Sequence, residues 1–301
     1  KKENLISKLN PIKKLANQTM VYGLSSVVGR LLNYLLVPLY TRCFLPEEYG
    51  VVTEIYAYVA FLVVFLTYGM ETAFFRFSNK EKDTNSVYST TLISVIFTSL
   101  LFIVLVLTNS SSISEWIGYH NNKEYIDWFA IIIGLDAISA ISFASLREQN
   151  KAIRFAVIRL INIFVNIGLN IFFIVYKGYG IEYIFISNLI SSIITIVLLS
   201  PEMLRSIWIF DNKLWKKMIV YALPLLIAGL AGMTNETIDR ILLKHLLSNP
   251  ETASSELGLY GAFYKLSIIM TLFIQTFRFA AEPFFFAQEK EGKSRKIYAD
   301  V

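Results

Sequence analysis

The sequence predicts an all-α protein that crosses a membrane several times. Of its 301 residues, 55% are hydrophobic and 17% are charged, whereas soluble domains average about 45–50% apolar and about 25% charged residues. The mean hydropathy is +0.53. The apolar residues are gathered into long runs, many of which reach the roughly 20 residues that an α-helix needs to cross a bilayer.

Eight apolar runs follow one another, separated by charged residues and turn residues. We predict membrane-spanning helices over 15–42, 50–75, 87–108, 126–146, 153–176, 180–200, 214–247 and 257–286. Several runs are longer than a simple crossing requires, and Pro38, Pro224 and Pro283 are the predicted bend sites. The single cysteine, Cys43, and the two histidines argue against a disulfide within the chain and against a Cys- or His-rich metal site. We expect no metal and no cofactor.

The distribution of Lys and Arg predicts the orientation of the chain. With the N-terminus in the cytoplasm, the inner segments hold 19 of these cations, and the outer segments hold only Arg42, Lys123, Lys177 and Lys244. Such a bias is the positive-inside pattern of membrane proteins. It also accounts for the net charge of +5, so we expect no nucleic-acid partner.

A weak internal repeat predicts two similar lobes. The first span contains VYGLSSVVGRL and the seventh VYALPLLIAGL; PEEYGVVTEIYAYVAFL follows the first, and SSELGLYGAFYKLSII follows the seventh. We therefore expect a six-helix N-terminal lobe (1–200), a cytoplasmic linker (201–213) and the first two helices of a C-terminal lobe (214–301), related by an axis along the membrane normal. In this interpretation, eight helices of a twelve- to fourteen-helix protein are visible. The alternative is a complete eight-helix protein.

Polar residues inside the spans fall on single helix faces. They form stripes on span 1 (Thr19, Tyr22, Ser26, Arg30, Asn33), span 5 (Arg159, Asn162, Asn166, Asn170), span 6 (Asn188, Ser191, Ser192, Thr195) and span 8 (Tyr260, Tyr264, Ser267, Thr271, Gln275, Arg278, Glu282). A bilayer does not tolerate such stripes facing lipid, so they face other helices or a wet cavity. For the Asn and Ser stripes of spans 5 and 6 we favour contacts between helices.

The charges within the spans lean positive. Arg30 lies deepest and has no acidic residue one turn away, and the planar guanidinium of an unpaired arginine suits an anion such as phosphate. Glu54, near the outer end of span 2, is a candidate coupling-ion site or partner for a cation. Glu236 and Arg240 are spaced to pair within span 7, and Lys265 either faces the cavity or extends to the interface.

Three motifs carry a family resemblance. They are L-x-x-x-Y-T-R-x-F-x-P-x-E-Y-G (Leu36 to Gly50), I-D-R-x-L-L (Ile238 to Leu243) and G-L-Y-G-A-F-Y-K-L (Gly258 to Leu266). With them, nearly the whole chain resembles polysaccharide-export flippases of the multidrug/oligosaccharidyl-lipid/polysaccharide exporter superfamily. The resemblance implies two six-helix lobes around a central cavity, alternating access, and a polyprenyl-diphosphate-linked oligosaccharide as cargo.

The resemblance also implies that cations of helices 1, 2, 7 and 8 hold the diphosphate. For this chain, the resemblance favours Arg30 as the main diphosphate-binding residue, followed by Arg240, Lys265 and Arg278, with Asn33 on the same stripe as Arg30. Span 2 departs from the family pattern because the stripe of residues in its middle is aromatic and lacks a cation. We expect a flippase in the bacterial inner membrane, in contact with lipid and with other polysaccharide-assembly proteins, and not an enzyme. The alternatives are a multidrug cation exporter with a carboxylate-centred site, and an integral-membrane glycan polymerase or glycosyltransferase, for which no motif is present.

Overall fold

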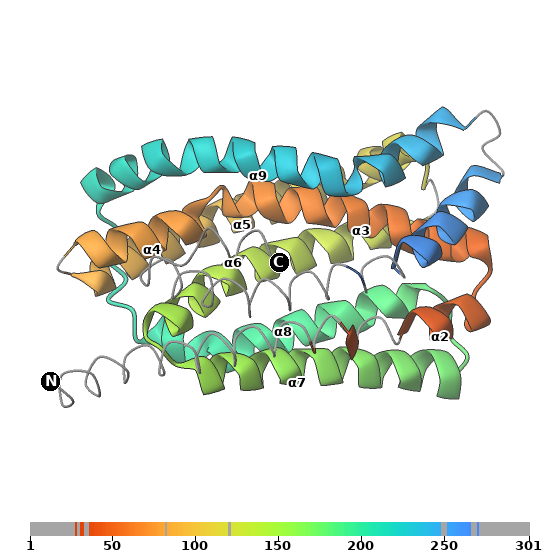
Figure 1. Ribbon diagram of the computed structural model, residues 1–301, viewed down its shortest axis with the longest axis horizontal. Coiled ribbons are helices and arrows are strands. Elements are labelled where there is room, and N and C mark those ends of the chain that lie inside the picture. Colours follow the sequence, from red (N-terminus) through yellow and green to blue (C-terminus); the bar gives the residue numbers. More distant parts are fainter. Residues whose placement is uncertain are drawn as a thin grey trace, which may run out of the picture.

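A computed structural model shows a bundle of helices (Figure 1). It describes residues 28, 31–32, 36–81, 83–119, 122–247, 252–265 and 270, and all regular elements among these residues are helical. Six of the described helical stretches are long and apolar enough to cross a membrane. The predicted class, an all-α membrane protein with several spans, is confirmed. Most of the first and the last predicted span lies outside the described residues.

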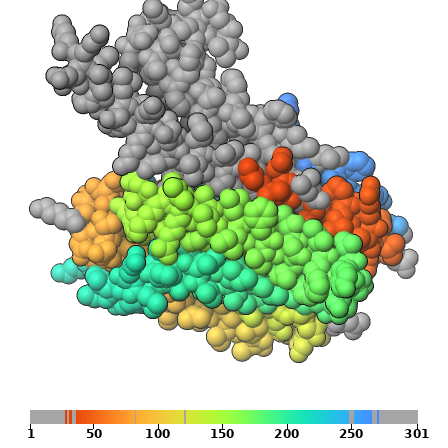
Figure 2. All heavy atoms as spheres, turned by 90° about the horizontal axis from the view of Figure 1, so that it is seen from below, coloured from red at the N-terminus to blue at the C-terminus, as the bar shows by residue number. Residues whose placement is uncertain are grey.

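The helices are, in chain order, α2 (Leu36–Cys43), α3 (Pro46–Thr67), α4 (Met70–Lys80), α5 (Thr84–Ile117), α6 (Lys123–Glu148), α7 (Ala152–Asn170), the π-helix η1 (Ile171–Tyr176), α8 (Glu182–Leu204) and α9 (Asn212–Leu246). Residues 252–265 are also helical. The long helices run along the length of the bundle, with α9 on one side, α7 and α8 on the other, and α6 between them (Figure 1). Seen from below, α7 and α8 lie side by side on one face (Figure 2).

The start of a long helix is marked by an aspartate in two places. The Asp83 carboxylate accepts hydrogen bonds from the backbone N–H groups of Asn85 and Ser86 at 3.1 and 3.2 Å. The Asp211 carboxylate does the same for Lys213 and Leu214 at 2.8 and 3.0 Å. These caps satisfy N–H groups that have no partner within the helix, and they fix where α5 and α9 begin.

The third predicted span extends further than expected. Its predicted end at residue 108 is wrong, because α5 continues through the polar segment N-S-S-S to Ile117. Thr108 and Asn109 donate side-chain hydrogen bonds to the carbonyls of Val104 and Leu105, each at 2.8 Å, so their polar groups are satisfied within the helix. The helix ends only at Gly118, which has φ +89° and is a left-handed cap.

The second predicted span is divided into two helices. α3 ends at Thr67 and α4 begins at Met70, and between them Tyr68 and Gly69 have φ values of +35° and +72°. A Cβ on Gly69 would lie 2.7 Å from the carbonyl oxygen of Ala222 in α9. Both the backbone conformation and the close approach therefore require glycine. The break contains no proline, whereas Pro224, a predicted bend site, lies inside the continuous helix α9.

At one end of the bundle, α3 meets the helix 252–265 backbone to backbone. A Cβ on Gly50 would lie 1.9 Å from the carbonyl oxygen of Ser254, and a Cβ on Gly258 would lie 1.9 Å from that of Pro46. When the two repeat segments are aligned from their first residues, Pro46 corresponds to Ser254 and Gly50 to Gly258. The contact is thus reciprocal, as at a two-fold interface.

We predict that Gly258→Ala destabilises the protein. The added methyl group cannot fit against the Pro46 carbonyl, so the two helices must separate, and overpacking of this kind costs about 1–3 kcal/mol. Thermal unfolding of the purified full-length protein in detergent measures the effect. Gly232→Ala is the matched control because no heavy atom lies within 4 Å of its added Cβ. Equal unfolding temperatures for the two variants would show that the helices do not meet here.

Candidate functional site

Two polar cavities meet inside the bundle. The first has a volume of about 230 Å³ and is lined by side chains of α2, α3, α7 and α8 and by Lys265. The second has a volume of about 250 Å³ and lies among α3, α6, α7 and α8. Asn162 of α7 and Asn188 of α8 line both cavities. The two cavities are therefore neighbours, with Asn162 and Asn188 at the boundary between them.

The asparagines of α7 join this helix to α8. The Asn162 side-chain amide donates hydrogen bonds to the Ser191 carbonyl at 3.1 Å and to the Thr195 hydroxyl at 2.9 Å. These bonds confirm the predicted role of the stripes in packing helices together. Packing is not their only role, however, because Asn162 and Asn188 also line the cavities.

Two tyrosines connect the N-terminal helices to this network. The Asn188 amide donates to the Tyr56 hydroxyl at 3.0 Å. The Tyr40 hydroxyl donates to Asn170 Oδ1 at 2.9 Å. Asn170 is fully buried and is the last residue of α7 before the π-helix η1. Single π-helical turns are often found at functional sites, and here the change of helix type adjoins the tyrosine contact.

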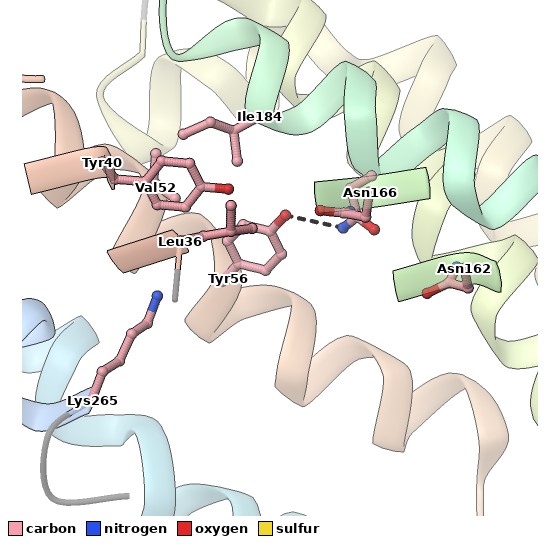
Figure 3. Close-up of a pocket in the computed structure, with 9 residues that line it drawn as sticks. Leu36, Tyr40, Val52, Tyr56, Asn162, Asn166, Ile184 and Lys265 are labelled. Atoms are coloured by element: carbon pink, nitrogen blue, oxygen red, sulfur yellow. Dashed lines mark hydrogen bonds between the residues drawn. The ribbon is translucent and has the colours of Figure 1, made fainter. Parts of the chain in front are cut away.

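Lys265 extends into the first cavity from the helix 252–265, toward Tyr56 and Leu36 (Figure 3). Its Nζ lies 5.2 Å from the centre of the Tyr49 ring, a favourable position for a cation. Of the two positions expected for Lys265, the structure therefore favours the cavity over the membrane interface.

Arg240 and Glu236 do not form the predicted ion pair within α9. The Arg240 guanidinium lies 4.1 Å from the centre of the Tyr264 ring, and Glu236 Oε1 accepts a hydrogen bond from the Tyr264 hydroxyl at 2.9 Å. No ion pair between the two residues occurs among the ion pairs of the described chain. The prediction is wrong because one tyrosine of the next helix offers a ring face to the cation and a hydroxyl to the carboxylate.

Glu54 is completely buried and is paired with a lysine. Lys244 Nζ of α9 donates to Glu54 Oε2 at 2.5 Å and to the Tyr119 hydroxyl at 3.1 Å. The Tyr119 hydroxyl in turn donates to Glu54 Oε2. Burial and the Glu54 charge raise the pKa of Tyr119, so its hydroxyl keeps its proton. Glu54 is thus a partner for a cation of the protein, and not an unpaired carboxylate.

Asp136 and Arg159 both line the second cavity. Asp136 Oδ1 accepts a hydrogen bond from the Ser192 hydroxyl at 2.8 Å, and the Arg159 guanidinium lies 4.4 Å from the centre of the Phe143 ring. Asp136 was not among the binding residues predicted for the flippase, but it is a carboxylate of the kind that the cation-exporter alternative requires. The sequence contains a signal for Asp136, because a carboxylate within a predicted membrane span is a functional candidate by default.

The remaining predicted binding residues, Arg30, Asn33 and Arg278, lie outside the described residues. Within the described part of the chain, no cluster of three or more His, Cys, Asp or Glu side chains could hold a metal ion.

Two solved structures resemble the chain across most of its length. One is an inward-facing conformation of a multidrug resistance MATE family transporter of the MOP superfamily, with a TM-score of 0.64, 15% identity, and coverage of 94% of this chain and 68% of the other. The second is the eukaryotic MATE transporter AtDTX14, with a TM-score of 0.55, 17% identity, and coverage of 90% and 66%. The chain therefore has the MATE transporter fold and spans about two thirds of the length of these structures.

No curated protein sequence matches the chain significantly. A family model described as "Polysaccharide biosynthesis protein" matches residues 15–287. The fold is that of MATE transporters, and the family description refers to polysaccharide biosynthesis. With this match over most of its length, the chain belongs to the polysaccharide biosynthesis protein family.

Proposed function

We propose that the protein is a flippase that carries a polyprenyl-diphosphate-linked oligosaccharide across the bacterial inner membrane for surface-polysaccharide synthesis. The family and the transporter fold support this function. The observation that carries it is the first cavity, where Lys265 is joined by tyrosine and asparagine side chains and by no carboxylate among the described lining residues. A cavity of this kind attracts an anion and offers hydrogen bonds to a polar cargo.

In this proposal, cations hold the diphosphate. Lys265 reaches the first cavity directly, and Arg240 lies one helix away on the face of Tyr264. Arg30, Asn33 and Arg278 complete the proposed binding site. Cations that rest on aromatic rings, and not on carboxylates, keep their charge available for a phosphate group.

The proposed transport cycle depends on two six-helix lobes that rock against each other. We assign residues 1–200 to the first lobe, 201–213 to a cytoplasmic linker and 214–301 to the start of a second, within a protein of twelve to fourteen helices and with a cytoplasmic N-terminus. The Glu54–Lys244–Tyr119 cluster then joins the lobes at the outer end. It has to break when that end opens, so the present arrangement corresponds to an outwardly closed state. An inward-facing conformation among the similar structures agrees with this assignment.

A second candidate function is export of cationic drugs. It is favoured by the Asp136 carboxylate in the second cavity and by the multidrug transporter among the similar structures. Efflux of ethidium that is lost in Asp136→Asn and retained in Lys265→Met would support it over the flippase. Arg159 in the same cavity argues against a cationic cargo, since like charges repel at short range in a low-dielectric site.

We predict that Lys265→Met lowers the flipping rate at least tenfold, because a neutral side chain of similar length cannot bind the diphosphate charge. Lys265→Arg is expected to retain most of the activity. The full-length protein in liposomes, supplied with the lipid-linked oligosaccharide that accumulates in cells lacking it, allows the rate to be measured by access of an added glycosidase to the outer leaflet.

The control for this variant is Lys177→Met. Lys177 is exposed at the end of η1 and contacts Phe172 and Tyr176, so its removal deletes a cation outside the cavity. Flipping by Lys265→Met at the wild-type rate would contradict the proposed anion site.

We also predict that Lys244→Gln opens the predicted outer end. Removal of one partner leaves Glu54 buried and uncompensated, which costs about 3–5 kcal/mol in comparable pairs. Spin labels at Glu47→Cys and Leu246→Cys, both exposed positions of α3 and α9, report their separation by pulsed dipolar spectroscopy in a Cys43→Ser background. We expect the ratio of long to short distances to rise at least tenfold.

The control for the opening experiment is Arg147→Gln. Arg147 pairs with Glu71, and both residues belong to the proposed N-terminal lobe, so the loss of this ion pair should leave the distance distribution unchanged. An unchanged distribution in Lys244→Gln as well would mean that the Glu54–Lys244 pair does not hold this end closed.

The orientation can be tested with the native cysteine. Cys43 is exposed at the end of α2, in a segment predicted to face outward. A membrane-impermeant maleimide is therefore expected to label intact spheroplasts that carry the wild-type protein, and to lose this signal with Cys43→Ser. Labelling only after the membrane is permeabilised would place the N-terminus outside.

A further inference from the structure

The second cavity contains two opposite charges that do not neutralise each other directly. Asp136 and Arg159 both line it, but the ion pairs of the described chain do not include them. Asp136 is bonded to Ser192 and Arg159 rests on Phe143. Charges between the helices of a bundle are stable only when polar groups satisfy their remaining hydrogen-bonding capacity. We therefore expect the cavity to hold a polar ligand.

Unused hydrogen-bonding groups line the same cavity. Ser139 lines the cavity and is 4% exposed, and its hydroxyl is buried without a hydrogen-bond partner. The hydroxyl therefore reaches an occupant only through another staggered rotamer of its side chain. Asn162 and Asn188 use their side-chain N–H groups as donors, while among the described residues their side-chain Oδ1 atoms accept no hydrogen bond. The occupant must thus offer both donors and acceptors, in several directions.

The chemistry of these groups fits a sugar ring. Each sugar hydroxyl both donates and accepts a hydrogen bond, and neighbouring hydroxyls can bind in pairs to planar carboxylate, amide and guanidinium groups. A cation fits less well because Arg159 lies in the same cavity. The volume of about 250 Å³ is below the roughly 300–1,000 Å³ of pockets for drug-sized ligands, so the cavity suits one sugar unit and not a whole oligosaccharide.

We propose that the cavity formed by Asp136, Ser139, Arg159, Asn162 and Asn188 is a sugar-binding subsite of the transporter. The subsite rests on the proposed function for the nature of its cargo. The two cavities are neighbours that share Asn162 and Asn188. In this proposal the two asparagine side chains move apart, so that one cargo molecule extends from a diphosphate at Lys265 to a sugar unit at Asp136. The protein would then recognise the glycan by hydrogen bonds as well as the diphosphate by charge.

Binding to two probes tests the subsite. One probe is the lipid-linked oligosaccharide extracted from cells that lack the protein, and the other is undecaprenyl diphosphate without sugar. We expect the full-length wild-type protein to bind the first probe at least tenfold more tightly. Asp136→Asn should weaken binding of the first probe about tenfold and Ser139→Ala about threefold, and neither should alter binding of the second probe.

Ser139→Ala is the more informative variant, because it removes a buried hydroxyl that has no partner and so should not lower the unfolding temperature. Ser99→Ala is its matched control: Ser99 is also buried, its hydroxyl also lacks a partner, and it does not line either cavity. We expect Ser99→Ala to bind both probes like the wild type.

The outcomes separate the subsite from the flippase. If the wild type prefers the sugar-bearing probe but Asp136→Asn and Ser139→Ala retain this preference, the subsite is wrong and the flippase stands. Equal binding of both probes by the wild type, or an equal loss for both probes in Asp136→Asn, also overturns the subsite alone. If the wild type binds neither probe, both proposals fail.

Discussion

The interior of a bilayer contains no water, so polar groups within a span are stabilised by partners inside the protein. This constraint explains the contacts between helices that are far apart in the sequence. Tyr40 reaches Asn170, and Asn162 reaches Thr195, and each bond fixes the rotation of one helix against another. The polar faces are thereby turned toward the inside of the bundle, where they leave the two cavities between them.

The cations of the bundle satisfy the same constraint in two ways. Lys244 has a carboxylate partner, Glu54, which is fully buried. Lys244 also lies over the Tyr119 ring, whereas Arg159, Arg240 and Lys265 lie over aromatic rings and belong to none of the ion pairs of the described chain. A ring face stabilises a cation without cancelling its charge. Lys244 therefore holds helices together, whereas Arg159, Arg240 and Lys265 remain able to attract an anion.

Hydropathy and charge were sufficient to predict the helical membrane class and most of the spans, because both depend on composition along the chain. The break at Tyr68 and Gly69 was missed because its cause is a close approach to α9, and not a proline. The partners of Glu54 were missed for a similar reason: Tyr119 and Lys244 are 65 and 190 residues away in sequence. The asparagine stripes were predicted to join helices, but a one-dimensional pattern does not tell whether a side chain also borders a cavity.

The reciprocal contact between Gly50 and Gly258 bears on how such a protein could arise. Gly50 meets Ser254, and the equivalent residue Gly258 meets Pro46, which is equivalent to Ser254. Two separate copies of one polypeptide could form the same pair of contacts. The contact between α3 and the helix 252–265 could therefore first have been the interface of a dimer of half-sized proteins. Fusion of the two genes would preserve this interface, and afterwards each copy could diverge, one gaining Glu54 and the other Lys265.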